Sequence, residues 1–351
     1  MTSPAVTRSR QATGPSISDV ARLAGVSAQT VSRVSTGTGP VRHETKERVL
    51  AAMAALGYSP NTAARALKYG SYRTFGIVAH QLARTGESRT IEAVVEAARG
   101  AGYTVTLVDV ESPSSSGVNE AMVRLTQQAI DGLIIIRAET VTPTALTLPP
   151  NLPVVVSDSR LASHHPAVGT DQVTGTRQAV EHLLALGHRT VHHLAGPDSS
   201  DPARIRAATW RATLLAAGRE VPALLTGDWT SEAGYRVGQE LAVATTSGPT
   251  EARPTAVFTS NDEMAFGLIR ALHEHGLRVP QDISVAGFDD IPLAAYLWPP
   301  LTTVHQDFPA IGSALVELLL RQLNQREVLT DTRVVVPTRL VVRESTAPPQ
   351  V

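Results

Sequence analysis

Cysteine is absent from the 351 residues of this chain. Without thiols the chain can form neither a disulfide scaffold nor a metal site built from thiolates. No apolar run in the sequence is long enough to span a bilayer. The first fifteen residues are rich in Ser, Thr, Arg and Gly and lack the apolar core of a secretory signal. We therefore expect a cytoplasmic protein whose residues 1–15 form a disordered tail.

Motifs for catalysis and metal binding are missing as well. The eleven histidines include two adjacent pairs, His164-His165 and His192-His193, whose imidazoles would point to opposite sides of a strand. No histidine pair combines a helical spacing with the nearby acid of a zinc protease, and no glycine-rich phosphate loop or nucleophile elbow occurs. We expect no metal, no cofactor and no enzymatic activity.

Length and charge limit the classes that remain. A chain of 351 residues with 42% hydrophobic side chains can bury a sizeable core and should hold two or three domains. The formal net charge is −1, but residues 1–70 contain nine Lys or Arg against three Asp or Glu, which gives +6 and leaves −7 for the remainder. A basic head on an acidic body fits nucleic-acid binding by the head. Charge alone leaves open a solvated surface with no such partner.

Two short helical patterns meet at Gly25. Each has two apolar residues three positions apart, which form one stripe on a helix. The pairs are Val20 with Leu23, and Val31 with Val34. Ser16, with Asp19 three residues later, and Ser27 are placed to cap the two helices, and Gly25 permits the tight turn between them. This spacing predicts a helix-turn-helix, whose second helix enters the DNA major groove. Any small helical hairpin is the alternative.

The exposed face of the second helix carries the groups that would read DNA. It presents Ala28, Gln29, Ser32 and Arg33. Gln pairs bidentately with adenine and Arg with guanine, whereas Ser and Thr commonly hold phosphates. Because Ala28 is small, we expect Gln29 and Arg33 to carry more of the choice of sequence.

A third helix is predicted over residues 43–56, with Gly57 as its C-cap. Its inward residues are Val49, Leu50, Met53 and Leu56. At this point the chain resembles the lactose-repressor/galactose-repressor (LacI/GalR) family of bacterial transcription regulators. The matching pieces are Asp19-Val20-Ala21, Ala24-Gly25-Val26-Ser27, Thr30-Val31-Ser32-Arg33-Val34, Leu56-Gly57-Tyr58, Pro60-Asn61 and Ala64-Arg65. The chain departs from the family at Ser35-Thr36, where Leu-Asn is common, and at Arg42, where a capping Ser is common.

The resemblance implies a hinge helix and linker over residues 61–73, after a helix-turn-helix domain over residues 16–60. In this family the hinge forms on operator DNA, and a leucine from each subunit wedges into the minor groove and kinks the duplex. Leu67 occupies that position here, followed by Lys68. The residues that the resemblance assigns to DNA are Ser27, Ala28, Gln29, Thr30, Ser32, Arg33, Asn61, Ala64, Leu67 and Lys68.

From Thr74 the pattern changes to alternating strands and helices, which is typical of an α/β fold with parallel sheets. Strands are predicted at residues 75–79, 103–108, 132–136, 154–156, 167–170, 190–195, near 224, and at 256–259, 284–288 and 334–340. Helices are predicted around residues 91–98, up to about 129, and at 172–186, 203–217, 232–244, 262–275 and 309–323. Two such lobes in sequence would leave a ligand cleft at the carboxyl ends of their strands.

This half resembles the family's periplasmic-binding-protein-like (type I) effector domain. The matching pieces are Asp131-Gly132-Leu133-Ile134, His182-Leu183, Leu186-Gly187-His188-Arg189, Asn261-Asp262, Met264-Ala265, Val285-Ala286-Gly287-Phe288-Asp289-Asp290 and Pro300-Leu301-Thr302-Thr303-Val304. The resemblance implies an effector-binding and dimerisation domain over residues 74–343, followed by a tail over 344–351. The expected N-terminal lobe covers about residues 74–160 and 305–331, and the C-terminal lobe about 171–292 and 332–343. Chain crossings are expected near Asp158–Asp171, Pro292–Gln306 and Asp331.

Several residues near strand ends are candidates for the cleft. Arg204, Asp289 and Asn261 match family positions that hydrogen-bond an effector, although Arg204 would otherwise be a surface helix arginine and Asn261 a helix cap. Trp229 and Phe308 match aromatic positions of sugar-responsive members, with core packing as the alternative for Trp229. The full expected effector set is His80, Asp158, Ser200, Arg204, Trp229, Asn261, Asp289, Gln306 and Phe308.

The sequence therefore predicts a homodimeric repressor of sugar-utilisation genes. A small sugar, such as a β-galactoside or a cello-oligosaccharide, would bind between the lobes and release the protein from a palindromic operator. A solute-binding protein for uptake and a regulator that responds to a non-sugar effector are the alternatives. A carbohydrate-active enzyme would need paired carboxylates, which Asp158, Asp289 and Asp290 could mimic. The sequence leaves open the effector's identity, the operator, the regulated genes and whether the ligand induces or co-represses.

Overall fold

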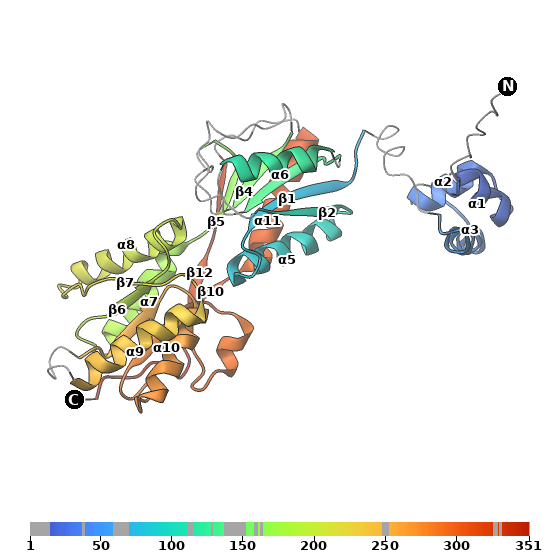
Figure 1. Cartoon of the computed structure of the whole chain (residues 1–351). Helices are drawn as coiled ribbons and strands as arrows, with labels where there is room; N and C mark the ends of the chain where they lie inside the picture. The colour runs from blue at the N-terminus through green and yellow to red at the C-terminus, as the bar shows by residue number, and fades with distance from the viewer. Residues whose placement is uncertain are drawn as a thin grey trace, which may run out of the picture. The chain divides into compact units, whose positions relative to one another are not determined.

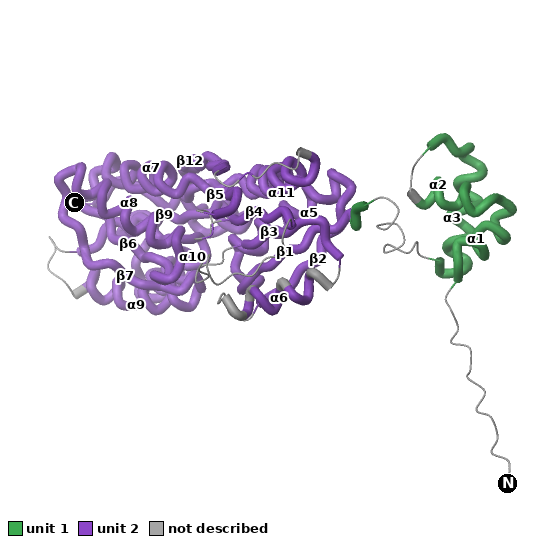
Figure 2. Tube along the Cα trace, turned by 90° about the horizontal axis from the view of Figure 1, so that it is seen from above, with its two compact units in different colours: residues 1–72 green, residues 73–351 purple. Residues whose placement is uncertain are grey.

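The chain divides into two compact units, Met1–Tyr72 and Arg73–Val351 (Figure 2). The computed structural model describes residues 15–36, 39–58, 70–110, 115–127, 129–136, 152–157, 161, 164–247, 253–325, 329 and 332–350. The predicted tail, except for its last residue, lies outside the described residues. So do five of the predicted site residues, Asn61, Ala64, Leu67, Lys68 and Asp158.

The first unit has three described helices, α1 (Ile17–Ala24), α2 (Ala28–Thr36) and α3 (His43–Leu56). Ser16 and Asp19 form the predicted capping box at the start of α1, with each side chain bonded to the other residue's backbone N–H. The Ser27 hydroxyl accepts a bond of 3.1 Å from the Thr30 backbone N–H, so Ser27 caps α2 as expected. Gly25 has φ +64°, the left-handed conformation that the turn between α1 and α2 requires.

The three helices enclose one small core. Its buried members are Val20, Ala21, Ala24, Val31, Val49, Ala52 and Met53. Two residues predicted to face inward are instead exposed: Leu23 retains 56% and Leu50 retains 47% of its surface. Each helix of so small a unit buries only one narrow stripe, and in α1 that stripe is formed by Val20, Ala21 and Ala24.

The second unit contains two six-stranded sheets in the part that the structure describes (Figure 1). The sheet of the N-terminal lobe has the order β11-β5-β4-β3-β1-β2 and is parallel throughout. Its strands are β1 (Thr74–His80), β2 (Thr104–Val110), β3 (Gly132–Ile136), β4 (Val154–Ser157), β5 (Ala167–Thr170) and β11 (Arg333–Val336). Helices α5 (Thr85–Gly100) and α11 (Phe308–Gln325) pack on one face and α6 (Ser115–Gln127) on the other.

The sheet of the C-terminal lobe has the order β12-β10-β9-β8-β6-β7, with only β12 antiparallel to its neighbour. Its strands are β6 (His192–Ala195), β7 (Leu225–Thr226), β8 (Ala256–Thr259), β9 (Ser284–Asp289), β10 (Thr302–Gln306) and β12 (Thr338–Val341). Its helices are α7 (Gln172–Ala185), α8 (Asp201–Ala216), α9 (Ser231–Ser247) and α10 (Asp262–Glu274). Helices α9 and α10 pack together, as do α7 and α8.

The inner strands of both sheets are buried on both faces, which explains their almost continuous apolar sequences. In β1, Phe75, Ile77 and Ala79 join the core beneath α5 and α11, whereas Val78 joins the core beneath α6. A strand alternates its side chains between two faces, so a strand covered by helices on both sides needs apolar residues at every position.

The chain crosses between the lobes three times, and two crossings lie later than the sequence predicted. The first falls at Asp171, within the expected range. The second falls at Asp307, because residues 302–306 form the unpredicted strand β10 of the C-terminal lobe. The third falls at Pro337 and not near Asp331, since the predicted strand 334–340 is two strands in different sheets. Proline has no N–H to continue a ladder, which suits the break at this position.

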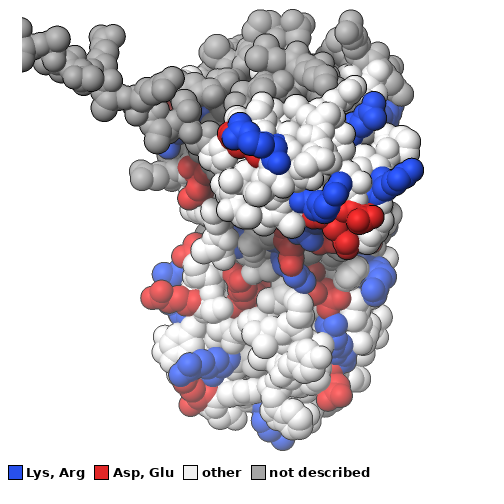
Figure 3. All heavy atoms as spheres, turned by 90° about the vertical axis from the view of Figure 1, so that its right-hand side faces the viewer, with Lys and Arg blue, Asp and Glu red and all other residues white. Residues whose placement is uncertain are grey.

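Charged side chains of both signs are interspersed on the face of the molecule drawn in Figure 3. No helix in the described ranges combines the length and the apolar character needed to cross a membrane.

Candidate functional site

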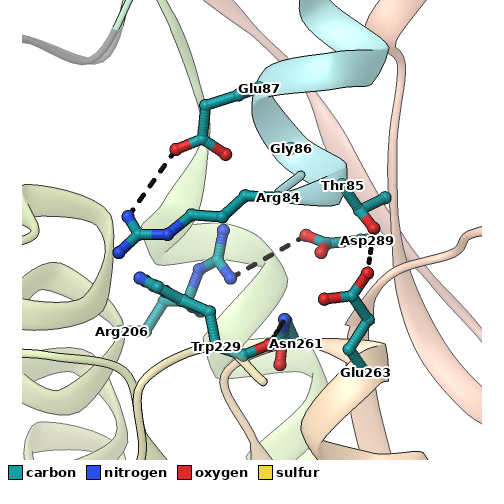
Figure 4. A pocket seen from close by; sticks show the side chains of 9 residues that line it. All are labelled: Arg84, Thr85, Gly86, Glu87, Arg206, Trp229, Asn261, Glu263 and Asp289. Atoms are coloured by element: carbon teal, nitrogen blue, oxygen red, sulfur yellow. Dashed lines mark hydrogen bonds and ion pairs between the residues drawn. The ribbon is translucent and has the colours of Figure 1, made fainter. Parts of the chain in front are cut away.

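A pocket lies between the two lobes of the second unit (Figure 4). It holds about 290 Å³ of empty space, part of which is open to solvent. The N-terminal lobe lines it from the start of α5, and the C-terminal lobe lines it from α8, the loop before α9, the start of α10 and the end of β9. The lining residues are Arg84, Thr85, Gly86, Glu87, Arg206, Trp229, Asn261, Glu263 and Asp289. Parallel strands thus present their carboxyl ends to a ligand site, as α/β sheets commonly do.

Arg206 is the most deeply buried cation of this pocket, with 1% of its surface exposed. Its Nε donates a bond of 2.8 Å to the Gln172 side chain, and its Nη1 donates to the Ser260 carbonyl. The guanidinium lies 3.5 Å from the centre of the Phe288 ring, and its Nη1 is 3.9 Å from an Asp289 oxygen. A buried guanidinium with these partners is held in one orientation, and it presents a fixed positive charge to the pocket.

Trp229 forms part of the C-terminal wall. Its residue is 5% exposed, and its indole Nε1 is buried without a hydrogen-bond partner among the described atoms. A side chain at Gly196 would lie 2.5 Å from the indole ring, so only glycine leaves room for it. The Asn261 side-chain N–H donates a hydrogen bond of 2.9 Å to the Trp229 carbonyl, and its side-chain oxygen accepts one of 3.0 Å from the Met264 N–H. Asn261 therefore caps α10 and also fixes the Trp229 loop.

Asp289 ends β9 with φ +118°, a strained conformation for a residue with a side chain. Its carboxylate accepts a bond of 2.5 Å from the Gln306 amide. The neighbouring Asp262 carboxylate accepts a hydrogen bond of 2.5 Å from the Thr303 hydroxyl and one of 2.9 Å from the Ile291 N–H. Burial, followed by the negative charge of Asp289, raises the pKa of the Asp262 carboxyl well above its usual range. This hydrogen-bonded support fixes the strand end that carries Asp289.

The N-terminal wall consists of the residues around the first turn of α5. Arg84 and Glu87 form an ion pair of 3.8 Å, in which the Glu87 side chain is 2% and the Arg84 side chain 21% exposed. The Thr85 hydroxyl donates to the Glu263 carboxylate, which belongs to α10 of the other lobe. This hydrogen bond connects the two lobes beside the pocket (Figure 4).

Three of the predicted effector residues line the pocket: Trp229, Asn261 and Asp289. Gln306 contacts Asp289 from behind without lining the pocket, and Phe308 packs in the core of the N-terminal lobe. The His80 ring nitrogen lies 2.7 Å from the Val110 carbonyl, and Ser200 is a buried residue directly before α8. Neither His80 nor Ser200 is among the residues that line the pocket.

The expectation for Arg204 requires correction. Its side chain is 50% exposed and pairs with Asp201 of the same helix, whereas Arg206 enters the pocket. Residues two apart on a helix point about 200° apart, so only one of the two arginines can face the cleft. The helical pattern contains the answer, because Arg206, Trp210 and Thr213 form the buried stripe of α8 and exclude Arg204.

Five other lining residues were missed by sequence reasoning: Arg84, Thr85, Gly86, Glu87 and Glu263. Four of them lie around the first turn of α5, whose predicted apolar stripe began only at Ile91. A first-turn acid such as Glu87 is common in helices because it stabilises the N-terminus, so its presence alone does not point to a site. Their role depends on the lobe that faces them.

A second candidate site is the outer face of α2 in the first unit. Ser27, Ala28, Gln29 and Arg33 are exposed there, while Thr30 and Ser32 are half-buried. The Ser27 and Thr30 hydroxyls are 2.9 Å apart, and Val31 anchors the opposite face in the core. The predicted recognition residues therefore share the outward side of one helix. No group of His, Asp and Glu suited to hold a metal ion occurs among the residues that the structure describes.

Comparison with known proteins identifies both units. A model of the lacI family of bacterial regulatory proteins matches residues 16–61, and a model of a periplasmic binding protein-like domain matches residues 180–346. The lactose operon repressor of Escherichia coli (strain K12) is 37% identical over 341 residues, which cover 94% of this chain and 90% of that protein.

Solved structures show the same architecture. The lac repressor dimer bound to operator and the anti-inducer ONPF is similar with a TM-score of 0.79 and 35% identity, over 95% of this chain and 100% of that one. The complex of the transcriptional regulator CelR with cellobiose gives a TM-score of 0.68 and 29% identity, over 94% and 99% of the two chains. The helix-turn-helix unit, the two-lobed fold and these relatives together establish that the chain belongs to the lacI family of bacterial regulatory proteins.

Proposed function

We propose that this protein represses transcription by binding operator DNA through its first unit, and that a small sugar in the interlobe pocket releases it. The observation that carries the proposal is the buried Trp229 indole in a pocket lined otherwise by polar and charged groups. An aromatic face packs against the C–H groups of a pyranose, while carboxylates, amides and guanidinium groups bind its hydroxyls. The lac repressor and the CelR–cellobiose complex support a sugar by analogy.

The DNA-binding part of the proposal rests on α2. Gln29 and Arg33 are the long polar side chains of its outward face, and Ser27 and Thr30 lie at its N-terminus, where hydroxyls and backbone N–H groups suit a phosphate. The described head residues include five Lys or Arg against three Asp or Glu, which favours an anionic partner. We expect two heads of one homodimer to bind the two halves of a palindromic operator.

Coupling between the two sites follows from linkage. A sugar can change operator affinity only if it binds one conformation of the protein more tightly than the other. The pocket takes residues from both lobes, and the Thr85–Glu263 bond already connects them, so a bound ligand would alter how the lobes meet. We infer that this change reaches the hinge, where Leu67 would lose its position in the minor groove. Leu67→Ala should then weaken operator binding strongly and leave sugar binding intact.

The DNA half is tested by selecting preferred sequences from a random duplex library with the full chain and measuring affinity by fluorescence anisotropy. Gln29→Ala should lose about 1–3 kcal/mol of discrimination at one base pair of the selected site. Gln239→Ala makes the same change at an exposed position of α9 and should bind like the parent protein. If the protein selects no sequence, or if Gln29→Ala keeps full specificity, the recognition assignment fails.

The effector half is tested by thermal shift with β-galactosides, cellobiose, other mono- and disaccharides and a purine. A ligand at 100 times its dissociation constant adds about 2.7 kcal/mol of stability. Trp229→Ala should abolish the increase in melting temperature that the sugar causes. Trp298 is 85% exposed, so Trp298→Ala should retain this increase. The same sugar must also lower operator affinity in the anisotropy assay. A shift with the purine alone would favour the non-sugar alternative.

An uptake protein and an enzyme fit the chain less well. A solute-binding protein has no use for a helix-turn-helix unit, and the matched relatives are regulators. The pocket holds Asp289 and two glutamates, yet Asp289 is engaged by Gln306 and lies near Arg206. A glycosidase needs one acid that is protonated and one that is free to attack or activate water. Incubation with the bound sugar, followed by chromatography, should therefore recover it unchanged.

A further inference from the structure

The charged residues of the N-terminal wall face the pocket from a single turn of α5. Arg84 directly precedes the helix, and Glu87 lies three residues later with its side chain 2% exposed. Burial of a carboxylate is costly unless its surroundings compensate, and here the Arg84 guanidinium and the N-terminus of α5 lie beside it.

A second pair on the same helix provides an internal reference. Arg89 and Glu92 have the same spacing of three residues, but they are 2.8 Å apart and exposed, at 38% and 68%. Arg84 and Glu87 are 3.8 Å apart, although a buried pair gains more from close contact than an exposed one. The exposed pair Arg99 and Glu96 of the same helix is 3.7 Å apart, so the spacing alone does not set Arg84 and Glu87 apart. What distinguishes them is that the pair is buried and lines the pocket.

The opposite wall repeats this spacing. Arg206 Nη1 and Asp289 Oδ1 are 3.9 Å apart across buried surroundings. Both distances exceed that of a hydrogen bond, and each pair puts a donor group beside an acceptor group. A hydroxyl can accept from a guanidinium and donate to a carboxylate at the same time, so it can bridge such a pair. Each wall thus presents one position suited to a hydroxyl group.

The charge of the pocket restricts the ligand further. Its lining contains two arginines and three acids, namely Arg84 and Arg206 against Glu87, Glu263 and Asp289, which gives a formal charge of −1. A phosphate or carboxylate would have to compete with Glu87 and Asp289 for the arginines while it lies close to three carboxylates. A neutral hydroxyl adds no charge and disturbs neither pair.

We propose that Arg84 and Glu87 are specificity residues that read a hydroxyl group of an uncharged sugar and exclude phosphorylated and acidic sugars. The inference rests on the proposed function of the pocket as the effector site. It assigns the N-terminal wall the choice between charged and neutral effectors, and the C-terminal wall the aromatic contact. Arg84 and Glu87 act together, so neutralising either one should affect both affinity and charge selectivity.

Isothermal titration of the full chain with matched probes tests this proposal. The probes are lactose, cellobiose and glucose, each beside its 6-phosphate (on the non-reducing residue of the disaccharides). We expect at least one neutral sugar to bind, and its phosphate to bind at least 100-fold more weakly. Glu87→Gln should lower the affinity for the neutral sugar at least tenfold. It should also reduce the ratio of the two dissociation constants, phosphorylated sugar over neutral sugar, at least tenfold. Glu92→Gln, the matched control on α5, should change both quantities less than twofold.

The change in ratio separates a specificity role from a structural one, because a loosened helix would weaken both probes alike. If Glu87→Gln fails to fold, Arg84→Gln serves as the second variant, because the Arg84 side chain is partly exposed. Its affinity for the neutral sugar should fall at least tenfold, whereas that of the control Arg89→Gln should not. A phosphorylated probe that binds as tightly as the neutral sugar overturns the proposal. So does an unchanged probe ratio in Glu87→Gln, or the absence of binding by every neutral probe.

Operator affinity should be measured on the same preparations. It distinguishes a failure of the proposal about Arg84 and Glu87 from a failure of the proposed function. If a phosphorylated sugar binds tightly and releases operator DNA, the proposed regulator function is retained. Only the selectivity of Arg84 and Glu87 for neutral sugars is then rejected. If the protein binds no operator DNA at all, the proposed function falls, whereas the comparison of probes still decides the assignment of Arg84 and Glu87.

Discussion

The two walls of the pocket are built in different ways. On the C-terminal side, Arg206, Trp229, Asn261 and Asp289 come from four separate segments and are joined to their neighbours by hydrogen bonds of side chains and backbone. On the N-terminal side, Arg84, Thr85 and Glu87 come from a single turn of one helix, and the lobe reaches across through the Thr85 hydroxyl. The first wall is rigid because several strands and helices fix it together, whereas the second depends on the position of one helix end.

This difference suggests a division of labour. A preorganised wall binds a ligand group without losing further conformational freedom. A wall carried by one helix end can move with its lobe, and movement of the lobes is what a regulator needs. We therefore expect substitutions on the C-terminal wall to affect stability and binding together, and those on the N-terminal wall to affect binding with little effect on stability.

The largest effect is expected for Arg206→Met. Loss of the buried guanidinium leaves the Gln172 oxygen and the Ser260 carbonyl without this donor, and the free energy of unfolding should fall by about 3–5 kcal/mol. Sugar binding should be lost as well. Arg204→Met, two residues earlier on an exposed side chain, should stay within about 0.5 kcal/mol of the parent protein. Urea denaturation measures both, and a larger loss in Arg204→Met would reverse our assignment of the pocket arginine.

Acid should destabilise the C-terminal lobe through His193 of β6, which packs against Trp210 and Phe258. Complete burial lowers the pKa of this imidazole from 6.5 to about 4, despite the Phe258 carbonyl that favours its charged form. Between these two values the unfolded chain binds a proton that the folded chain does not, so stability falls as the pH falls from about 6.5 to 4. The loss should reach about 3 kcal/mol near pH 4.

The measurement is a series of denaturation curves across this pH range. In His193→Phe this pH-dependent loss in the free energy of unfolding should disappear. The variant also loses the hydrogen bond of 2.9 Å to the Phe258 carbonyl, which lowers its stability at every pH. An unchanged slope between pH 6.5 and 4 would show that His193 is not the group responsible.

A smaller change should follow Gly196→Ala. The added methyl group would lie 2.5 Å from the Trp229 ring and would have to displace it, which costs about 1–3 kcal/mol and weakens sugar binding. Gly100→Ala at the end of α5 meets no atom within 4 Å and serves as the control. If the two variants melt at the same temperature and bind alike, the packing of Trp229 against Gly196 does not shape the pocket.

The smallest effect on stability is expected for Thr85→Val, which removes the hydroxyl that bonds Glu263. Stability should fall by about 1 kcal/mol or less, because one partly buried hydrogen bond is lost. The response of operator affinity to sugar should change more than stability does, since this bond joins the lobes. Ser88→Ala, which removes an exposed hydroxyl of the same helix, is the control. A stability loss as large as that of Arg206→Met would abolish the contrast between the walls.

Much of the fold could be predicted because local patterns carried it. The strands Gly132–Ile136, Ala167–Thr170 and Ala256–Thr259 were predicted to the residue, since apolar runs bounded by turns leave little freedom. Strand β10 was missed because its Thr and His residues lack an apolar run, and burial in the sheet gives them their role. Leu23 and Leu50 were misplaced because helical spacing does not say how many stripes a small unit can cover.

By itself the sequence determined the family and the capped helix-turn-helix, because motifs and turn chemistry are local. The family motifs also singled out Trp229, Asn261 and Asp289. The tertiary structure decided which arginine of α8 faces the ligand and placed the first turn of α5 opposite Trp229 and Asp289. It also assigned β10, β11 and β12 to their lobes. These features depend on contacts between segments far apart in the chain, such as Thr85 with Glu263, which are 178 residues apart. Spacing along the chain does not encode which segment another one meets, because that follows only once the lobes have packed.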